Sequence, residues 1–183
     1  MDKYIATVLE ELTTTMSALD SDRLETLTYQ IAGKSKVFCC GLGRSGLVMK
    51  ALAMRLKQMG MDSVVVGEST APAFGEGDSL IVCTASGASP ILKYYTGLAK
   101  ENGGKVYVIT GEQNSPIAEL ANELVLIPAP NKDDPENGIL SIQPMGTLFE
   151  QSAALLCDAL ILHLMRHMGI TGDDMRKCHA NIE

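Results

Sequence analysis

Two turns rich in glycine and hydroxyl residues each follow a short apolar run, and both could bind an anion. Residues 41–46 (GLGRSG) follow the apolar run 36–41, and residues 84–90 (TASGASP) follow the run 79–83. In the second turn, Ser89 is placed to cap a helix whose first residue is Pro90. Amides at a helix N-terminus and Ser or Thr hydroxyls can surround a phosphate monoester without net positive charge. The alternative is that these small residues only cap the helix and close the turn.

The first turn also matches the three-glycine pattern of dinucleotide-binding proteins. Glu68 falls near the end of the next predicted strand, where an acid would bind a ribose. Two observations argue against a nicotinamide enzyme: few residues remain to hold a second substrate, and no tyrosine is followed four residues later by lysine. Within this turn, Arg44 could contact sugar hydroxyls or phosphate, or form a surface ion pair.

The elements that must position these turns form a repeating pattern. Apolar runs at 36–41, 63–66, 79–83, 105–110 and 124–127 predict strands, and helical spacing of apolar residues at 45–59 and 90–101, with a shorter segment at 116–122, predicts helices between them. This alternation predicts an α/β three-layer sandwich of the flavodoxin or Rossmann-like type, a five-stranded parallel sheet flanked by helices. Because ligands of such sheets bind beyond the carboxyl ends of the strands, both turns should face one crevice.

Helical segments flank this core. An amphipathic stretch covers residues 3–31 with a break at 20–22, and an apolar helix is predicted over 145–168 before a charged tail at 173–183. We expect one domain over residues 1–183, with a helical N-terminal segment 1–33, an α/β core 34–128 and a C-terminal helical segment 145–183. The long irregular loop 128–144 is of the kind that is usually functional or mobile.

Composition narrows the choice of partner and compartment. Fifteen Lys and Arg against 22 Asp and Glu give a net charge of −7, and only 4% of residues are aromatic, so we expect no nucleic acid partner. No run approaches the roughly 20 apolar residues of a membrane helix, and the start of the chain lacks a signal-peptide core, so we expect no membrane association. Five cysteines, three of them in apolar runs, indicate reduced thiols and a cytoplasmic protein.

The chain resembles the sugar-isomerase (SIS) domain family over nearly its whole length, and within that family the 6-phospho-3-hexuloisomerases. The resemblance rests on residues 37–46 (VFCCGLGRSG), 64–72 (VVVGESTAP), 77–81 (GDSLI), 144–150 (PMGTLFE) and 179–183 (HANIE). It implies a homotetramer, a dimer of dimers, that interconverts 6-phospho-3-hexulose and fructose 6-phosphate without metal or organic cofactor.

Site residues follow from the same resemblance. It implies that Ser45, Ser86 and Ser89 bind phosphate with help from Thr84, that Gly43 and Arg44 belong to the binding turn, and that Glu150 and His179 transfer protons. Moving a carbonyl from C3 to C2 requires removal of the C2 proton, an enediolate, and return of a proton at C3. A partly desolvated carboxylate can be the base.

Alternatives remain for each of the acid/base residues. Glu150 near the start of an apolar helix could instead be a glutamate favoured by the helix dipole. Glu68 could be the base or could bind a sugar hydroxyl. His179, five residues from the end of the chain, is the kind of residue that is usually solvated, unless the tail lies in an active site, whether of its own or of another subunit.

The phosphate turn departs from the family pattern. The 6-phospho-3-hexuloisomerases commonly carry SGSGET, whereas this chain has TASGAS with Ala88 at the acidic position. The hydroxyl positions are kept, so phosphate binding is less affected than sugar preference. A phosphosugar-binding protein without turnover and an isomerase of another ketose or aldose phosphate are the two rival functions.

Overall fold

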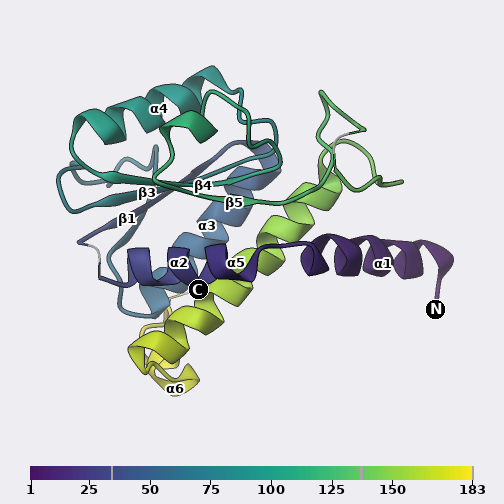
Figure 1. Ribbon diagram of the computed structural model, residues 1–183. Coiled ribbons are helices and arrows are strands. Elements are labelled where there is room, and N and C mark those ends of the chain that lie inside the picture. Colours follow the sequence, from purple (N-terminus) through teal and green to yellow (C-terminus); the bar gives the residue numbers. More distant parts are fainter. Residues whose placement is uncertain (34, 137, 183) are drawn as a thin grey trace.

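The computed structural model describes residues 1–33, 35–136 and 138–182. Its centre is a parallel sheet of five strands in the order β2-β1-β3-β4-β5 (Figure 1). The strands are β1 (Val37–Gly41), β2 (Ser63–Val65), β3 (Ser79–Thr84), β4 (Lys105–Thr110) and β5 (Glu123–Leu126). β1 pairs with both β2 and β3, so the strand order reverses at the boundary between β1 and β3.

Helices cover both faces of this sheet, which confirms the predicted three-layer sandwich (Figure 1). One face carries α4 (Pro90–Glu101) and the short 3₁₀ helix η1 (Ala118–Leu120), and the other carries α2 (Ser21–Ala32), α3 (Gly43–Gln58) and α5 (Thr147–Met168). Alternate residues of each strand enter two separate cores. Cys39, Ile81 and Ile109 pack toward α3 and α5, whereas Cys40, Val82 and Val108 pack toward α4.

The long helix α5 is a core helix. It is long and apolar enough to cross a membrane by length and composition alone. Nine of its residues are buried, however, because the helix lies against α2 and α3: Leu148, Phe149, Ser152, Ala153, Leu156, Cys157, Leu160, Ile161 and Leu164. The burial of this face explains its apolar sequence.

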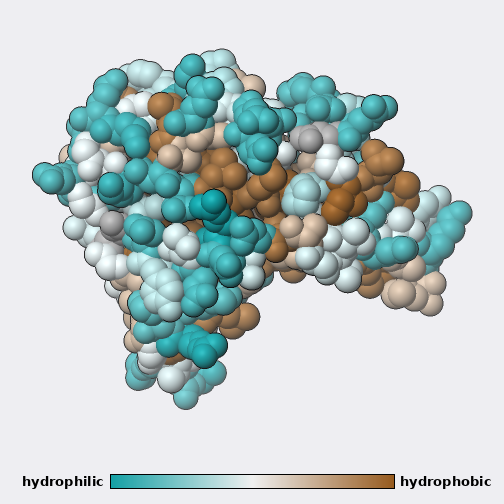
Figure 2. All heavy atoms as spheres, in the orientation of Figure 1, coloured by the Kyte–Doolittle hydropathy of each residue, from teal (hydrophilic) through white to brown (hydrophobic). Residues whose placement is uncertain are grey.

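The N-terminal helix α1 (Lys3–Ser17) projects from the body and touches it chiefly through α5 (Figure 1). Figure 2 shows hydrophobic residues gathered where this helix meets the body. Exposed apolar side chains lie on α1 and on the segment that leads to α5: Tyr4, Ile5, Leu9, Leu140 and Ile142. The short helix α6 (Gly172–Lys177) follows α5 and lies at its C-terminal end (Figure 1).

Element boundaries differ from the predicted ones in two informative places. The segment 116–122 forms only the three-residue η1. α5 begins at Thr147 and not at residue 145, because Met145 has a left-handed backbone with φ 62° and Gly146 is the residue before the helix. Residues 172–177 of the charged region form α6.

Candidate active site

A cavity of about 180 Å³ opens at the carboxyl ends of β1 and β3, where the strand order reverses. Its walls come from both predicted turns, from the loop after β5 and from the start of α5: Leu42, Ser45, Cys83, Thr84, Ala85, Ser86, Ser89, Leu92, Asn131, Lys132, Asp133, Met145, Gly146 and Glu150. A larger hollow of about 470 Å³ near Arg23 and Pro128 contains neither turn. We therefore place the candidate site in the smaller cavity.

The glycines of the first turn are required by close packing of β1 against α3. A Cβ atom at Gly41 would lie 2.9 Å from the Ser45 backbone, and one at Gly46 would lie 2.7 Å from the Gly41 carbonyl oxygen. Gly43 has a φ of 55°. The three-glycine pattern thus has a structural cause that needs no dinucleotide.

Ser45 lies on the cavity wall, buried and hydrogen-bonded to the Cys83 thiol. Burial raises the pKa of Cys83 to about 12, and the contact with Ser45 only partly opposes this rise. Cys83 is therefore a protonated, unreactive wall residue at neutral pH.

In the second turn, one serine caps helix α4 and another is partly exposed to the cavity. The Ser89 hydroxyl accepts a hydrogen bond from the Leu92 amide at 3.5 Å, and Pro90 occupies the first turn of α4, as predicted. Thr84 Oγ1 accepts a bond from the Gly87 amide at 3.2 Å. Ser86 is partly exposed on the cavity wall. Capping and ligand binding are therefore compatible here, because Ser86 and Ser89 both face the cavity beside the N-terminus of α4.

Glu150 lies in the first turn of α5 with its side chain 20% exposed. Its Oε2 is 2.9 Å from Nη1 of Arg44, which also donates to Thr147 Oγ1 at 3.1 Å. Burial raises the pKa of Glu150 above its ordinary value, and the Arg44 guanidinium opposes the rise. The site thus presents a carboxylate made more basic by partial desolvation, with a cation at its side.

The loop after β5 supplies wall residues that we did not select from the sequence. Asn131 is buried and its Oδ1 accepts from the amides of Asp133 and Asp134 at 2.9 and 3.0 Å, which fixes Lys132 and Asp133 at the cavity. The only sequence signal for these residues was the length and irregularity of the loop 128–144.

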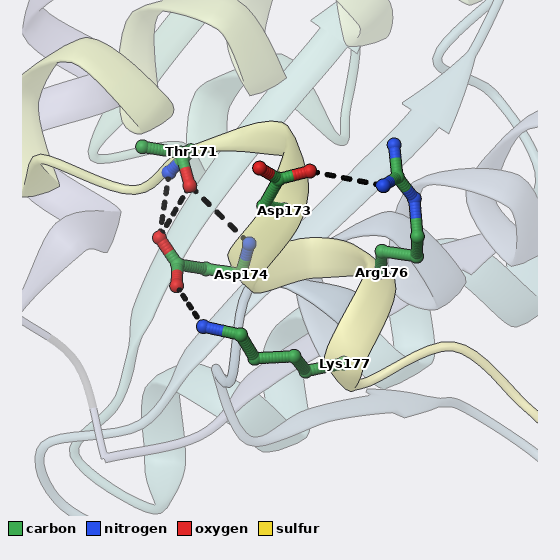
Figure 3. Close-up of polar contacts among 5 residues, drawn as sticks. All are labelled: Thr171, Asp173, Asp174, Arg176 and Lys177. Carbon is green, nitrogen blue, oxygen red and sulfur yellow. Dashed lines mark hydrogen bonds and ion pairs between the residues drawn. The ribbon is translucent and has the colours of Figure 1, made fainter.

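Two of the candidate acid/base residues, Glu68 and His179, lie away from this cavity. Glu68 follows β2, is 53% exposed and pairs with Lys50 at 3.6 Å. His179 lies beyond α6, which is held by the Thr171–Asp174 capping box and the Asp173–Arg176 and Asp174–Lys177 ion pairs (Figure 3). α5 has 22 residues, so about 33 Å of helix separates the end that bears Glu150 from the end that leads to α6.

Gly43 and Arg44 are not on the cavity wall themselves, but Arg44 reaches it through Glu150. Within residues 1–33, 35–136 and 138–182, no group of three or more His, Cys, Asp or Glu side chains is arranged to hold a metal ion.

The fold and the cavity define an α/β domain with a candidate ligand site at the carboxyl ends of its strands. The SIS domain model matches residues 30–155, so the chain belongs to the SIS domain family. A 3-hexulose-6-phosphate isomerase of Bacillus subtilis is 36% identical over 99% of this chain and 98% of its own. One of Mycobacterium gastri is 35% identical over 98% of this chain and 89% of its own.

A solved structure is similar over the full length of both chains. It is a hypothetical protein from Methanococcus jannaschii whose structure infers a function of 3-hexulose-6-phosphate isomerase, with a TM-score of 0.84 and 26% sequence identity.

Proposed function

We propose that the protein is a phosphosugar isomerase that interconverts 6-phospho-3-hexulose and fructose 6-phosphate. The observation that carries the proposal is the placement of Glu150 and the serine turns on one small cavity. The full-length relatives named 3-hexulose-6-phosphate isomerase support the same substrate class.

The phosphate of the sugar binds at the second turn. Ser86 and Ser89 donate hydroxyls, Thr84 holds the turn in shape, and the amides at the start of α4 face the dianion. Ser45 adds a hydroxyl from the first turn. This arrangement fixes one end of the sugar, so that its second and third carbons extend toward Glu150.

Glu150 removes the C2 proton, and the electron pair of the broken C–H bond forms the C2–C3 double bond while O3 takes the negative charge. Arg44, 2.9 Å from Glu150, stabilises this enediolate. O3 gains a proton and O2 loses one, and Glu150 returns its proton to C3, which gives the C2 carbonyl of fructose 6-phosphate. The partial burial that raises the Glu150 pKa strengthens it as a base.

His179 moves the proton between O2 and O3, and we propose that it does so in the site of a neighbouring subunit. His179 follows α6 and is absent from the cavity wall that bears Glu150 in the same chain, which supports an exchange between subunits. A homotetramer, built as a dimer of dimers, supplies such neighbours. The exposed apolar residues Tyr4, Ile5 and Leu9 on the projecting α1 support burial of this helix in an assembly.

We also propose that residues 1–183 form one SIS domain that works in the cytoplasm. α1 and α2 both pack on α5, and α2 also packs on β5, which supports one folding unit. All five cysteines are free, and four of them are buried, which suits a reducing compartment.

The proposal is tested by incubating the purified protein with 6-phospho-3-hexulose and measuring fructose 6-phosphate. We expect turnover well above the uncatalysed background, and a panel of other ketose and aldose phosphates should react more slowly. Tight binding of the sugar phosphate without turnover would instead identify a phosphosugar-binding protein.

A further inference from the structure

The carboxylate of Glu11, on the projecting helix α1, binds the segment that leads into the catalytic region. Glu11 is 9% exposed. Its carboxylate accepts hydrogen bonds from Ser141 Oγ at 2.6 Å, the Ile142 amide at 2.9 Å and Gln143 Nε2 at 2.9 Å. Burial raises the pKa of Glu11, but these three bonds outweigh the burial and hold the pKa below its ordinary value. The side chain is therefore an ionised acceptor at neutral pH.

A continuous chain of contacts leads from this segment to Glu150. The Pro144 carbonyl oxygen accepts from Thr147 Oγ1 at 2.6 Å and from the Thr147 amide at 3.2 Å. Thr147 Oγ1 in turn accepts from Arg44 Nη1 at 3.1 Å, and the same nitrogen lies 2.9 Å from Glu150. The orientation of the Arg44–Glu150 pair thus depends on where the Pro144 carbonyl is held.

Between these contacts the backbone is in an unfavourable conformation. Met145 has a φ of 62°, which is disfavoured for a residue with a side chain, and it lines the cavity together with Gly146. Such a conformation persists only where the surroundings fix it. The hydrogen bonds that Glu11 accepts fix the three residues just before Pro144, and so supply one of the constraints that Met145 requires.

We propose that Glu11 is a positioning residue that holds residues 141–147, and through Thr147 the Arg44–Glu150 pair, in the geometry for proton transfer. This inference rests on the proposed function of Glu150 as the base. It assigns to the N-terminal helix a role in the reaction, although α1 contributes no residue to the cavity wall.

The test compares Glu11→Ala and Glu11→Gln with Glu10→Ala. Glu10 is the exposed neighbour on the same helix, so its replacement removes the same charge without touching the segment 141–147. Glu11→Ala should lower kcat for the isomerase reaction by about tenfold to a hundredfold, as expected for a small misplacement of catalytic groups. KM should change less than about threefold, because the phosphate turn lies on other elements.

Glu11→Gln should restore most of the lost kcat, because its amide oxygen can still accept from the Ile142 amide. Its amide nitrogen can donate to Ser141 Oγ and, once the Gln143 amide group has turned over, to Gln143 Oε1. Glu10→Ala should stay within about twofold of the parent protein. A kcat of Glu11→Ala equal to that of the parent would overturn the proposal, as would an equal loss in Glu10→Ala.

Hydrogen exchange measured by mass spectrometry gives a readout that does not depend on activity. In Glu11→Ala, amides in peptides that cover 139–147 should exchange at least about tenfold faster, while peptides of β3 and the turn 84–90 stay unchanged. Unchanged exchange at 139–147 would refute the role of Glu11 even in an inactive protein. Absence of turnover in the parent protein would refute the proposed function, and the exchange result would still decide whether Glu11 holds this segment.

Discussion

Replacing Glu150 by glutamine tests which of the two candidate carboxylates, Glu150 or Glu68, is the base. The change keeps the shape of the side chain and removes only its ability to take a proton. General base catalysis contributes about 10²- to 10⁴-fold, so kcat should fall by at least about 10²-fold, which is about 2.7 kcal/mol of barrier. KM should change little, because the phosphate turn is untouched.

The same change should leave the fold intact. The Arg44–Glu150 ion pair has a half-exposed arginine, so its loss costs at most about 1 kcal/mol, and relief of the partly buried charge offsets this cost. For a chain of this size, that corresponds to a shift of the unfolding temperature of about 2–4 °C at most. A large loss of kcat in a protein that unfolds within this range therefore cannot be caused by unfolding.

Glu68→Gln is the matched control. Glu68 is 53% exposed, contacts Lys50 and is absent from the cavity wall, so kcat should stay within about twofold of the parent. The assay follows fructose 6-phosphate formation, and NMR in D₂O follows exchange of the C3 proton of fructose 6-phosphate, which reports proton removal directly. If Glu150→Gln keeps its kcat and C3 exchange while Glu68→Gln loses both, the assignment of the base is wrong.

Three further predictions follow from the same geometry. The pKa of Glu150 is raised in the folded state, so ionisation of Glu150 destabilises the folded parent protein as pH rises. The unfolding temperature of Glu150→Gln minus that of the parent should therefore increase between pH 4 and pH 8. Ser89→Ala should lower the unfolding free energy by about 1 kcal/mol through loss of the helix cap and raise KM for the phosphosugar about tenfold, as kinetics and thermal unfolding can check. A third prediction concerns His179 acting across a two-fold interface. An equal mixture of refolded Glu150→Gln and His179→Ala chains should then recover roughly a quarter of parental activity. No recovery would assign both residues to one chain.

Features with a local cause could be predicted from the sequence. The apolar runs gave all five strands, since strands buried on both faces must be continuously apolar. Ser89 and Pro90 marked the start of α4 because capping depends on adjacent residues. The meeting of the two turns also followed, because parallel strands place their carboxyl ends at one edge.

Features that depend on distant contacts could not be predicted. Glu11 and Ser141 are 130 positions apart, and nothing near either residue indicates that they meet. The left-handed Met145 breaks the helical pattern at a residue type that gives no sign of it. The Arg44–Glu150 pair likewise joins two distant elements, α3 and α5. The sequence therefore could not decide whether Arg44 forms a surface ion pair or contacts a ligand.

The position of Ala88 bears on the departure from the family pattern of the phosphate turn. Ala88 is exposed and is not part of the cavity wall, whereas Ser86 and Ser89 on either side of it are. Gly87 cannot be replaced, because a Cβ atom there would lie 2.0 Å from Ser115 Oγ, so the turn keeps its shape whichever side chain follows. An acid at position 88 would therefore occupy an exposed position next to the cavity wall and not on it. Ser86 and Ser89, whose hydroxyls belong to the cavity wall, are retained, so we expect the departure to affect the proposed phosphate binding less than the sugar preference.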